Sequence, residues 1–412
     1  MKNLSYVDFE VAYEKCLELV VPTQKTEIIY ILDSIGRVCS KDIICTKNLP
    51  SFNSSAMDGF ACKISDAGKS LKIVDTIFAG DKKAFEELKD NECYKIMTGA
   101  KVPQCVETIV QIERCKDITK NSVQVPSNLV QNSNIKFKAE EYKTGDILIK
   151  IGEKISSSHI ALLASQGITN IEVFCKLQIA VISTGNELVE PWQKAKKDEI
   201  YNSNAFALIA LLKENSFEAS YCGVISDNFE KSVEFLKELQ KFDLILTSGG
   251  VSMGDADFIA SAFLKCGLKV AYHGVNLKPG KAMMIGTLNQ SLVVSLPGNP
   301  LAALINAYIF LLPMLKKCQG ELKYFHDFIV CINQKSFNVK EKRVEAVLGK
   351  VENGKFLVTM NNKYGSGMIS AIYKSNALML SNGNNSDIKE DNDIKVLEFN
   401  GNFVEKNINF LN

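Results

Sequence analysis

The sequence predicts a multidomain α/β protein, in which a domain with a mostly parallel sheet is joined to a β-rich insertion domain, a linker domain and a C-terminal β domain. The first observation is length: 412 residues exceed one ordinary hydrophobic core and suggest two to four domains at about 150 residues each. The second is a regular alternation of strands and helices between residues 177 and 320. The third is that short strand-like pieces dominate at 48–142 and 321–412.

The N-terminal part is predicted to begin with a helix. Residues 5 to 20 carry apolar side chains at helical spacing, among them Val7, Val11 and Leu17, and Pro22 then interrupts the pattern. A strand, a helix at 157–166 and a further strand return between residues 145 and 173. These pieces lie on either side of the β-rich segment, within residues 1–47 and 143–176.

The insertion domain is predicted at 48–142, where β-rich pieces are separated by Gly, Pro and Asn. Its clearest strands are 71–78, 93–97 and 108–112.

The α/β domain is predicted at 177–320, because apolar strand-like runs alternate there with helical segments. The expected strands are 178–182, 221–225, 244–247, 282–285 and 292–295, and the expected helices are 205–214, 229–240, 258–265 and a helix from Pro300 onward. Such alternation implies a mostly parallel sheet covered on both faces, with ligand-binding loops at the carboxyl ends of the strands. The C-terminal domain, 321–412, shows strand-like pieces at 328–332, 344–351 and 356–359, and 382–393 is predicted to be a solvated loop.

Composition excludes several classes of function. Lys+Arg 48 against Asp+Glu 47 leave a net charge of +1, without the basic excess that nucleic-acid binding requires. The longest apolar stretches, such as 303–315, are shorter than the roughly 20 apolar residues of a membrane span. The N-terminus has no leader pattern, and the twelve cysteines form no CxxC pair, which favours reduced thiols. A cytoplasmic protein without a zinc site is expected.

Two motifs follow strands of the predicted sheet. After the first strand, residues 183–188 (STGNEL) place Glu187 behind a glycine turn. After the third, residues 247–257 (TSGGVSMGDAD) bring small residues together, whose backbone N–H groups can form a nest for phosphate or another oxyanion. Either loop alone is also typical of a simple tight turn.

Two further motifs lie later in the same domain. Lys278 and Lys281 flank a Pro-Gly turn suited to anionic oxygens, although a solvated basic turn would look the same. In 296–300 (LPGNP), Asn299 suits a helix N-cap and Pro300 the first helical position. That fit is a sufficient structural explanation, while the amides of this loop could also meet a ligand.

Carboxylates near an oxyanion site raise an electrostatic problem. Glu187, Asp227, Asp255 and Asp257 would repel a phosphate unless a divalent cation lay between them. Oxygen ligands and substrate phosphate favour Mg²⁺. The alternative is that these acids are helix caps or surface groups.

Two loops of the insertion domain are rich in small, polar and turn residues, as ligand-binding loops often are. Residues 49–61 (LPSFNSSAMDGFA) present Asp58, and 96–103 (IMTGAKVP) present Thr98. Ordinary Asx-type turns would show the same residues.

Taken together, the motifs resemble one known family. NSSAMDGFA, IMTGAKVP, VISTGNELV, YNSNAFAL, TSGGVSMGDAD, LKPGKA and SLPGNP occur in the order and approximate spacing of the molybdopterin molybdenumtransferases, the MoeA and gephyrin E-domain type. The resemblance covers about residues 5 to 400, and it implies that residues 1–47 and 143–176 together form a linker domain. It implies a homodimer whose cleft lies between the α/β domain of one subunit and the insertion domain of the other.

The resemblance also implies the reaction: molybdate is ligated to the dithiolene of adenylylated molybdopterin, the adenylate is hydrolysed and AMP is released, with a divalent metal. By position, Glu187 and Asp257 resemble the acids for metal binding and hydrolysis, joined by Asp227 at the metal and by Asp58 from across the dimer. The residues that would hold the substrate or molybdate are Thr98, Thr184, Gly249, Gly250, Ser252, Lys278, Lys281, Pro297 and Pro300. Partners implied in the pathway are a molybdopterin adenylyltransferase and apo-molybdoenzymes.

The chain departs from the family pattern at the end of the insertion domain. The family usually has an arginine-rich segment there, and this chain has the sequence KFKAEE at residues 136–141. Lysine lacks arginine's bidentate fork, so anion contacts there are expected to differ. Two alternatives remain open: a non-catalytic molybdopterin-binding scaffold, and a CinA-like nucleotide hydrolase. The acids at 187 and 257 favour catalysis over a scaffold, and the MDGF segment is absent from the hydrolases.

Overall fold

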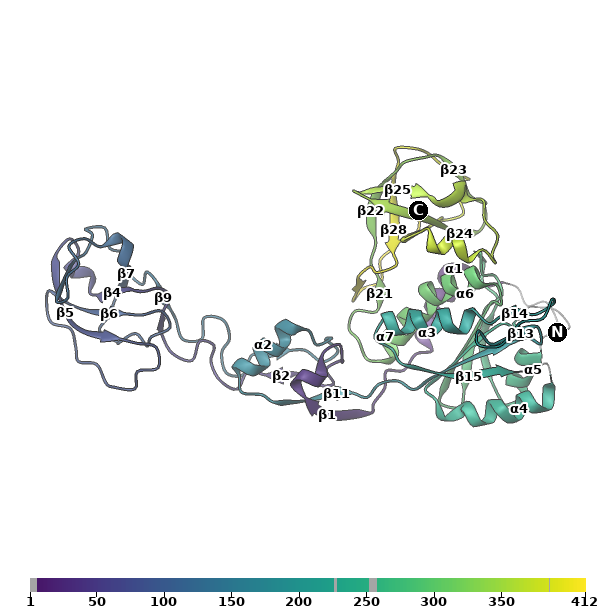
Figure 1. The fold of residues 1–412 in the computed structure, drawn as a ribbon, viewed down its shortest axis with the longest axis horizontal. Helices are drawn as coiled ribbons and strands as arrows, with labels where there is room; N and C mark the ends of the chain where they lie inside the picture. Colours follow the sequence, from purple (N-terminus) through teal and green to yellow (C-terminus); the bar gives the residue numbers. More distant parts are fainter. Residues whose placement is uncertain (1–5, 226–227, 252–257, 385) are drawn as a thin grey trace. The chain divides into compact units, whose positions relative to one another are not determined.

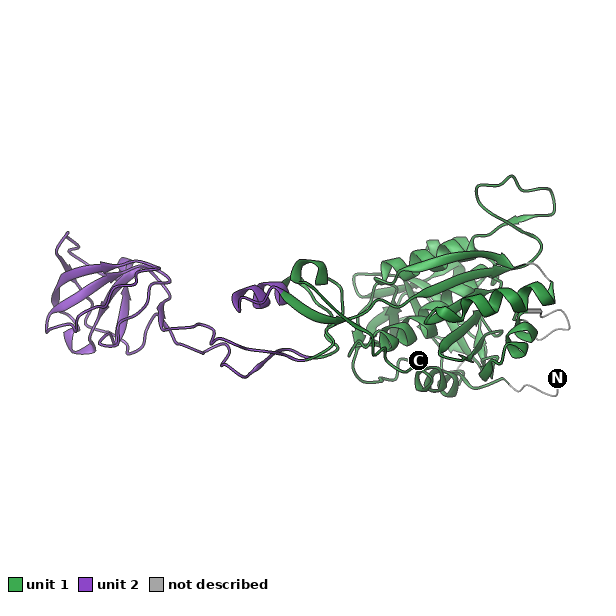
Figure 2. Cartoon of the chain, turned by 90° about the horizontal axis from the view of Figure 1, so that it is seen from below, with its two compact units in different colours: residues 1–41, 151–157, 170–412 green, residues 42–150, 158–169 purple. Residues whose placement is uncertain are grey.

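The computed structural model describes residues 6–225, 228–251, 258–384 and 386–412. The chain divides into two compact units (Figure 2): residues 1–41, 151–157 and 170–412 form one, and residues 42–150 and 158–169 form the other. The finer division into four domains stays a prediction.

The larger unit contains a six-stranded sheet in the order β15-β12-β16-β20-β19-β17. Its strands are β12 (Ile179–Thr184), β15 (Ala219–Ile225), β16 (Leu244–Ser248), β17 (Lys269–His273), β19 (Met284–Leu288) and β20 (Ser291–Leu296). The pairings β15–β12, β12–β16 and β16–β20 are parallel, whereas β20–β19 and β19–β17 are antiparallel. The sheet is therefore mixed. Only two residues separate β19 from β20, and a parallel crossover needs about a dozen.

Both faces of this sheet are covered (Figure 1). The helices are α1 (Phe9–Glu18), α3 (Asn204–Glu214), α4 (Phe229–Glu238), α5 (Phe258–Lys265), α6 (Pro300–Asn306) and α7 (Leu312–Cys318). Odd-numbered β12 residues such as Val181 join the core under α1, α3, α6 and α7, and the alternating Ala180 and Ile182 join the core under α4 and α5. Because successive side chains of a strand point to opposite faces of the sheet, β12 contributes to two separate cores. Two short strands, β13 (Leu188–Val189) and β14 (Ile200–Tyr201), pair beside the sheet.

One helix is apolar all round. From Pro300 to Cys318 the chain is helical, with α6 and α7 joined by a π turn, η5 (Ala307–Leu311), close to Pro313. A proline cannot donate an α-helical hydrogen bond, and such turns accommodate the defect. By length and composition the helix could cross a membrane, with mean hydropathy 1.5, but 89% of the apolar window is buried inside the protein. It is longer than the apolar stretch noted in the sequence, and burial in the core explains its composition.

The predicted first helix is shorter than expected and buries a different face. Helix α1 buries Phe9, Ala12, Tyr13, Cys16 and Leu17, which follow the 3.6-residue period. Val11, predicted to be on the apolar face, is 42% exposed. The chain then forms β1 (Thr26–Tyr30) and the 3-10 turn η1 (Ile31–Ser34), and β1 pairs antiparallel with β11 (Asn170–Phe174).

The C-terminal part of this unit is a second six-stranded sheet, in the order β18-β24-β25-β22-β28-β26. Its strands are β18 (Leu277–Lys278), β22 (Ile329–Asn333), β24 (Val344–Glu352), β25 (Lys355–Val358), β26 (Ala377–Leu380) and β28 (Asp393–Glu398). Shorter elements are β21 (Phe325–His326), β23 (Phe337–Asn338), α8 (Ile369–Tyr373), β27 (Asp387–Ile388) and β29 (Phe403–Val404). Strand β27 lies inside the predicted loop 382–393, where Ile388 is buried and pairs with Phe337.

The smaller unit holds a five-stranded sheet in the order β7-β4-β6-β5-β8. Its strands are β4 (Gly59–Cys62), β5 (Ser70–Ile77), β6 (Glu92–Ile96), β7 (Thr108–Gln111) and β8 (Ser122–Gln124). The same unit also contains β2 (Ile43–Ile44), β3 (Ser54–Ser55), β9 (Ile135–Lys136), β10 (Ile147–Ile149) and most of α2 (Ser157–Ser165). The predicted strands 71–78, 93–97 and 108–112 are found within one residue at each end. All twelve cysteines of the chain lie in its described part, and none of them is in a disulfide bond.

Candidate functional site

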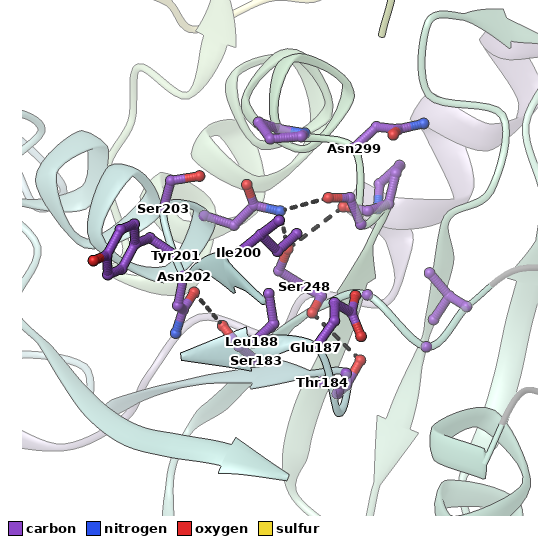
Figure 3. Close-up of a pocket in the computed structure, with 18 of the residues that line it drawn as sticks. Ser183, Thr184, Glu187, Leu188, Ile200, Tyr201, Asn202, Ser203, Ser248 and Asn299 are labelled. Carbon is purple, nitrogen blue, oxygen red and sulfur yellow. Dashed lines mark hydrogen bonds between the residues drawn. The ribbon is translucent and has the colours of Figure 1, made fainter. Parts of the chain in front are cut away.

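A pocket of about 630 Å³ lies at the carboxyl ends of β12, β16 and β20 (Figure 3). These adjacent parallel strands end at Thr184, Ser248 and Leu296, so the loops that follow them meet at one edge of the sheet. The described residues that line it are 183–185, 187, 188, 200–204, 248–251, 282 and 297–300. Thr184, Glu187, Gly249, Gly250, Pro297 and Pro300, predicted from sequence, are therefore brought together.

The turn after β16 requires glycine. Gly249 and Gly250 have φ of +92° and +68°, a region that favours glycine. A Cβ on Gly249 would lie 2.7 Å from Thr184 Oγ1 and 2.9 Å from Thr184 O. The Gly249 N–H donates to Leu296 O at 3.1 Å, so it is already used and only later amides of the turn could serve an anion. At the end of the turn, Val251 O accepts from Nε2 of the buried His273 at 3.1 Å.

Glu187 provides the one described carboxylate in this pocket's lining. Its side chain is exposed and folds back over Gly185, because a Cβ built on Gly185 would lie 2.7 Å from Glu187 Oε2. Gly185 has φ +137°, so this turn too depends on the missing side chain. The first loop therefore holds an accessible acid against the strand end that carries Thr184.

Two asparagines, Asn202 and Asn204, line the pocket and connect its loops by hydrogen bonds. Asn204 Nδ2 donates to Ser248 Oγ at 2.7 Å and to Gly298 O at 2.8 Å, and so connects the end of β16 to the loop after β20. Asn202 Oδ1 accepts from Ser183 Oγ at 2.9 Å, and its Nδ2 donates to Tyr221 Oη at 2.7 Å. Burial first, and then the hydrogen bond to Glu190, raises the pKa of Tyr221 well above its usual value. These asparagines were not predicted as site residues, although the polar NSN run before α3 was a usable signal.

The loop after β20, residues 297–300, agrees with the prediction in its helix cap position but not in the capping hydrogen bond. Asn299 occupies the N-cap of α6 and Pro300 the first turn, as predicted, but the Asn299 side chain makes no capping hydrogen bond. An amide side chain that does not cap is available to a ligand. Pro297 and Asn299 line both this pocket and its neighbour.

Lys278 and Lys281 lie in the neighbouring pocket, of about 480 Å³, rather than in the first. Lys278 Nζ is 2.6 Å from Glu345 Oε1, whose side chain is 4% exposed. Lys281 Nζ lies 3.4 Å from the centre of the Tyr6 ring, a cation–π contact. Lys340 and Arg343 line the same pocket. The C-terminal sheet contributes the counter-ion, since Glu345 belongs to β24.

Asp58 and Thr98 meet in the smaller unit. Asp58 Oδ1 accepts from the Thr98 N–H at 2.7 Å and from Thr98 Oγ1 at 2.8 Å. These bonds, the backbone one foremost, lower the pKa of the exposed Asp58 carboxyl. The two loops predicted from sequence therefore form one small polar cluster.

Four residues singled out in the sequence, Asp227, Ser252, Asp255 and Asp257, lie outside the described residues. Within 6–225, 228–251, 258–384 and 386–412, no three His, Cys, Asp or Glu side chains gather as they would around a metal ion. Glu187 can supply one oxygen ligand, and Mg²⁺ is usually held by one or two carboxylates together with substrate phosphates. The described residues are therefore compatible with Mg²⁺ only when substrate completes its shell.

Comparison with known proteins covers almost the whole chain. Family profiles match in order: the MoeA N-terminal region (domain I and II) at residues 7–167, the probable molybdopterin binding domain at 180–317, and the MoeA C-terminal region (domain IV) at 332–399. A molybdopterin molybdenumtransferase of Haemophilus influenzae is 32% identical over 402 residues, 94% of this chain and 98% of that protein. One of Staphylococcus epidermidis is 29% identical over 91% of this chain and 92% of that protein. The crystal structure of a molybdopterin biosynthesis MoeA protein from Pyrococcus horikoshii shares the fold, with a TM-score of 0.85 at 23% identity, over 96% of this chain and 100% of that one.

Proposed function

Because this chain belongs to the molybdopterin molybdenumtransferase family, enzymes of molybdenum cofactor biosynthesis, we propose that it ligates molybdate to adenylylated molybdopterin and releases AMP. The observation that carries the proposal is the pocket at the carboxyl ends of β12, β16 and β20, within the segment matched by the molybdopterin-binding profile. This is the edge at which open α/β sheets bind ligands. The cofactor-binding scaffold and the nucleotide hydrolase are the competing functions.

The phosphates of the substrate would lie against the turn at Gly249 and Gly250. Both glycines keep side chains out of the space beside Thr184, so the backbone can approach an oxyanion closely. The Asn204 bonds to Ser248 and Gly298 hold the loops in place before a ligand arrives. Such preorganised groups stabilise charge without reorganising during the reaction.

Molybdate would enter from the neighbouring pocket, where four cationic side chains and the buried Glu345 lie together. Pro297 and Asn299 form a wall common to both pockets, so an anion beside Lys278 and Lys281 would lie next to the site proposed for the phosphates. Lys278 is held by Glu345, which fixes where its ammonium group stands. An oxygen of water or of molybdate would then form a new bond to the phosphorus of the adenylate. The bond from that phosphorus to the bridging oxygen would break, the bridging oxygen would stay on the phosphate of molybdopterin as the leaving group, and AMP would carry the attacking oxygen.

Glu187 is proposed as the acid that serves hydrolysis, together with Asp257. A Mg²⁺ ion bound to Glu187 and substrate oxygens, with Asp227 and Asp257, would screen charge and polarise the phosphoanhydride. What the described chain itself supplies is an exposed carboxylate fixed over Gly185.

A homodimer is part of the proposal. Ile28 is 72% exposed, and Tyr30 on β1, Leu32 on η1 and Ile35 directly after η1 are exposed with it. An apolar run of this kind is typical of a protein interface. Asp58 and Thr98 would then reach the active site of the second subunit. Light scattering should give a dimer mass, and Ile28→Lys should shift it toward the monomer, whereas a monomeric wild type would contradict this part.

The protein is proposed to act in the cytoplasm, to receive its substrate from a molybdopterin adenylyltransferase and to pass its product to apo-molybdoenzymes.

The test is turnover of adenylylated molybdopterin with molybdate and Mg²⁺, followed as AMP release and as activation of an apo-molybdoenzyme. The wild type should do both. Glu187→Ala should fold normally and lose AMP release, whereas Glu234→Ala, which removes an exposed acid from α4 outside the pocket, should behave as wild type. A wild type that releases no AMP would favour the scaffold. AMP release that does not depend on molybdate and yields no active cofactor would favour the hydrolase.

A further inference from the structure

The pocket offers few flat surfaces to a substrate that contains two ring systems. Of the described side chains that line it, only Tyr201 is aromatic. Adenylylated molybdopterin carries an adenine and a pterin, and the purine of the first and the pyrimidinone ring of the second each offer a flat face that can stack on an aromatic side chain. If the proposed function is right, one ring can stack on Tyr201, and the other has no aromatic partner among the described residues that line this pocket.

A loop at the pocket rim carries the required aromatic side chain. Strands β13 and β14 both contribute pocket-lining residues, and they pair in parallel register, Leu188 with Ile200 and Val189 with Tyr201. The chain between them, residues 190–199, is therefore attached to the rim at both ends. It contains Trp192, the only tryptophan in the chain, which is 69% exposed.

The indole of Trp192 packs against a row of aromatic side chains. Its ring centre lies 6.0 Å from that of Phe206 in an edge-to-face contact, and Phe206 in turn lies 5.5 Å from Tyr221. Tyr221 is held by hydrogen bonds with Asn202 and Glu190. Phe206 lies on α3, two residues after Asn204 of the pocket wall. The contact with Phe206 leaves most of the indole uncovered, so it is available for stacking.

The loop is also tied back to the pocket. The Ala195 N–H donates to Tyr201 Oη at 3.4 Å, and Gln193 Oε1 accepts from the Glu190 N–H at 3.1 Å. Ordering an exposed tryptophan in this way has a low entropic cost on binding, because the ring has few torsions to fix.

We propose that Trp192 is a second stacking platform, which binds a planar heteroaromatic ring of the substrate that extends past Tyr201. The shared chemistry is a flat nitrogen heterocycle joined to a phosphate, and its source is either the adenine or the pterin. This inference rests on the proposed function for the identity of the substrate. Trp192 is thus a specificity-determining residue that holds a part of the substrate remote from the reacting bonds.

Fluorescence gives the first test, because all tryptophan emission comes from this one side chain. AMP and neopterin are titrated separately into the wild-type protein, with inorganic phosphate as the control. The ligand whose ring stacks on Trp192 should change the emission saturably, and phosphate should not. AMP acting alone assigns the platform to adenine, and neopterin acting alone assigns it to the pterin. Emission that neither ligand changes would overturn the proposal.

Kinetics gives the second test. Removing a base–aromatic stack typically weakens binding by an amount that corresponds to about tenfold in affinity. Trp192→Ala should raise KM for adenylylated molybdopterin about tenfold with kcat unchanged, and Trp192→Phe should restore part of the loss. Tyr373→Ala, which removes another exposed aromatic outside both pockets, should not alter KM. An unchanged KM in Trp192→Ala would overturn the proposal while AMP release by the wild type still supports the function. A wild type without AMP release would instead refute the function.

Discussion

Gly249 permits a direct test of whether the turn after β16 is built for close approach. In Gly249→Ala the new residue must keep φ near +92°, which costs about 1–2 kcal/mol for an L-residue. The methyl group must also displace Thr184, whose Oγ1 and carbonyl oxygen lie 2.7 and 2.9 Å from its ideal position. Overpacking of this kind adds about 1–3 kcal/mol. The combined cost of about 3 kcal/mol should lower Tm by roughly 10 °C.

Gly223 is a matched control in the same sheet. It lies on β15 with φ +98°, and a Cβ built there meets nothing within 4 Å. Gly223→Ala should therefore cost only the backbone contribution, about 1–2 kcal/mol. Thermal unfolding and calorimetric titration with AMP separate the two variants. Gly249→Ala should lose at least about tenfold in AMP affinity, because bonds to a charged phosphate are displaced, and Gly223→Ala should bind as wild type. Equal Tm and equal AMP affinity in the two variants would refute the reasoning.

Three other predictions concern charge. Thr98→Val keeps the backbone N–H but removes the hydroxyl that donates to Asp58, so the pKa of Asp58, now lowered, should rise part of the way toward its usual value in an NMR titration; an unchanged pKa would contradict the assignment of its cause. Burial lowers the pKa of His326 to about 4, so the neutral ring favours the folded state above pH 6.5. This contribution to the free energy of unfolding, about 3 kcal/mol, should be lost as pH falls from 6.5 to about 4. In His326→Gln the free energy of unfolding should depend less on pH over that range, and equal pH dependence in the two proteins would refute the prediction. Lys278→Met leaves the buried Glu345 without its cation and should cost about 2 kcal/mol, part of which Lys278→Met/Glu345→Gln should recover in thermal unfolding; strictly additive losses would argue against the coupling.

Local pattern predicted the elements well where one period dominated. The helix expected at 258–265 is found with those bounds, and the expected strand at 292–295 lies within β20. The pattern failed where direction or facing depended on distant partners. Periodicity cannot tell whether β19 runs parallel or antiparallel, and the two-residue turn before β20 was the available signal. Val11 was predicted to face the core, but the buried face of α1 is the one that carries Phe9 and Tyr13.

The site was predicted in part for the same reason. Strand-end loops brought Thr184, Glu187, Gly249 and Gly250 together, since the carboxyl ends of parallel strands share one edge. The ion pair of Lys278 joins residues 67 positions apart, and no local spacing encodes such a partner. This ion pair explains why Lys278 lies in the neighbouring pocket. Asn204 was missed because its role, linking Ser248 to Gly298, exists only once three loops meet.

The most direct test of the central claim is a crystal structure of the protein with AMP bound. The account predicts the phosphate of AMP in the pocket at the ends of β12, β16 and β20, against the turn at Gly249 and Gly250 and within reach of Glu187. AMP bound at another surface, with that turn uncovered, would contradict it.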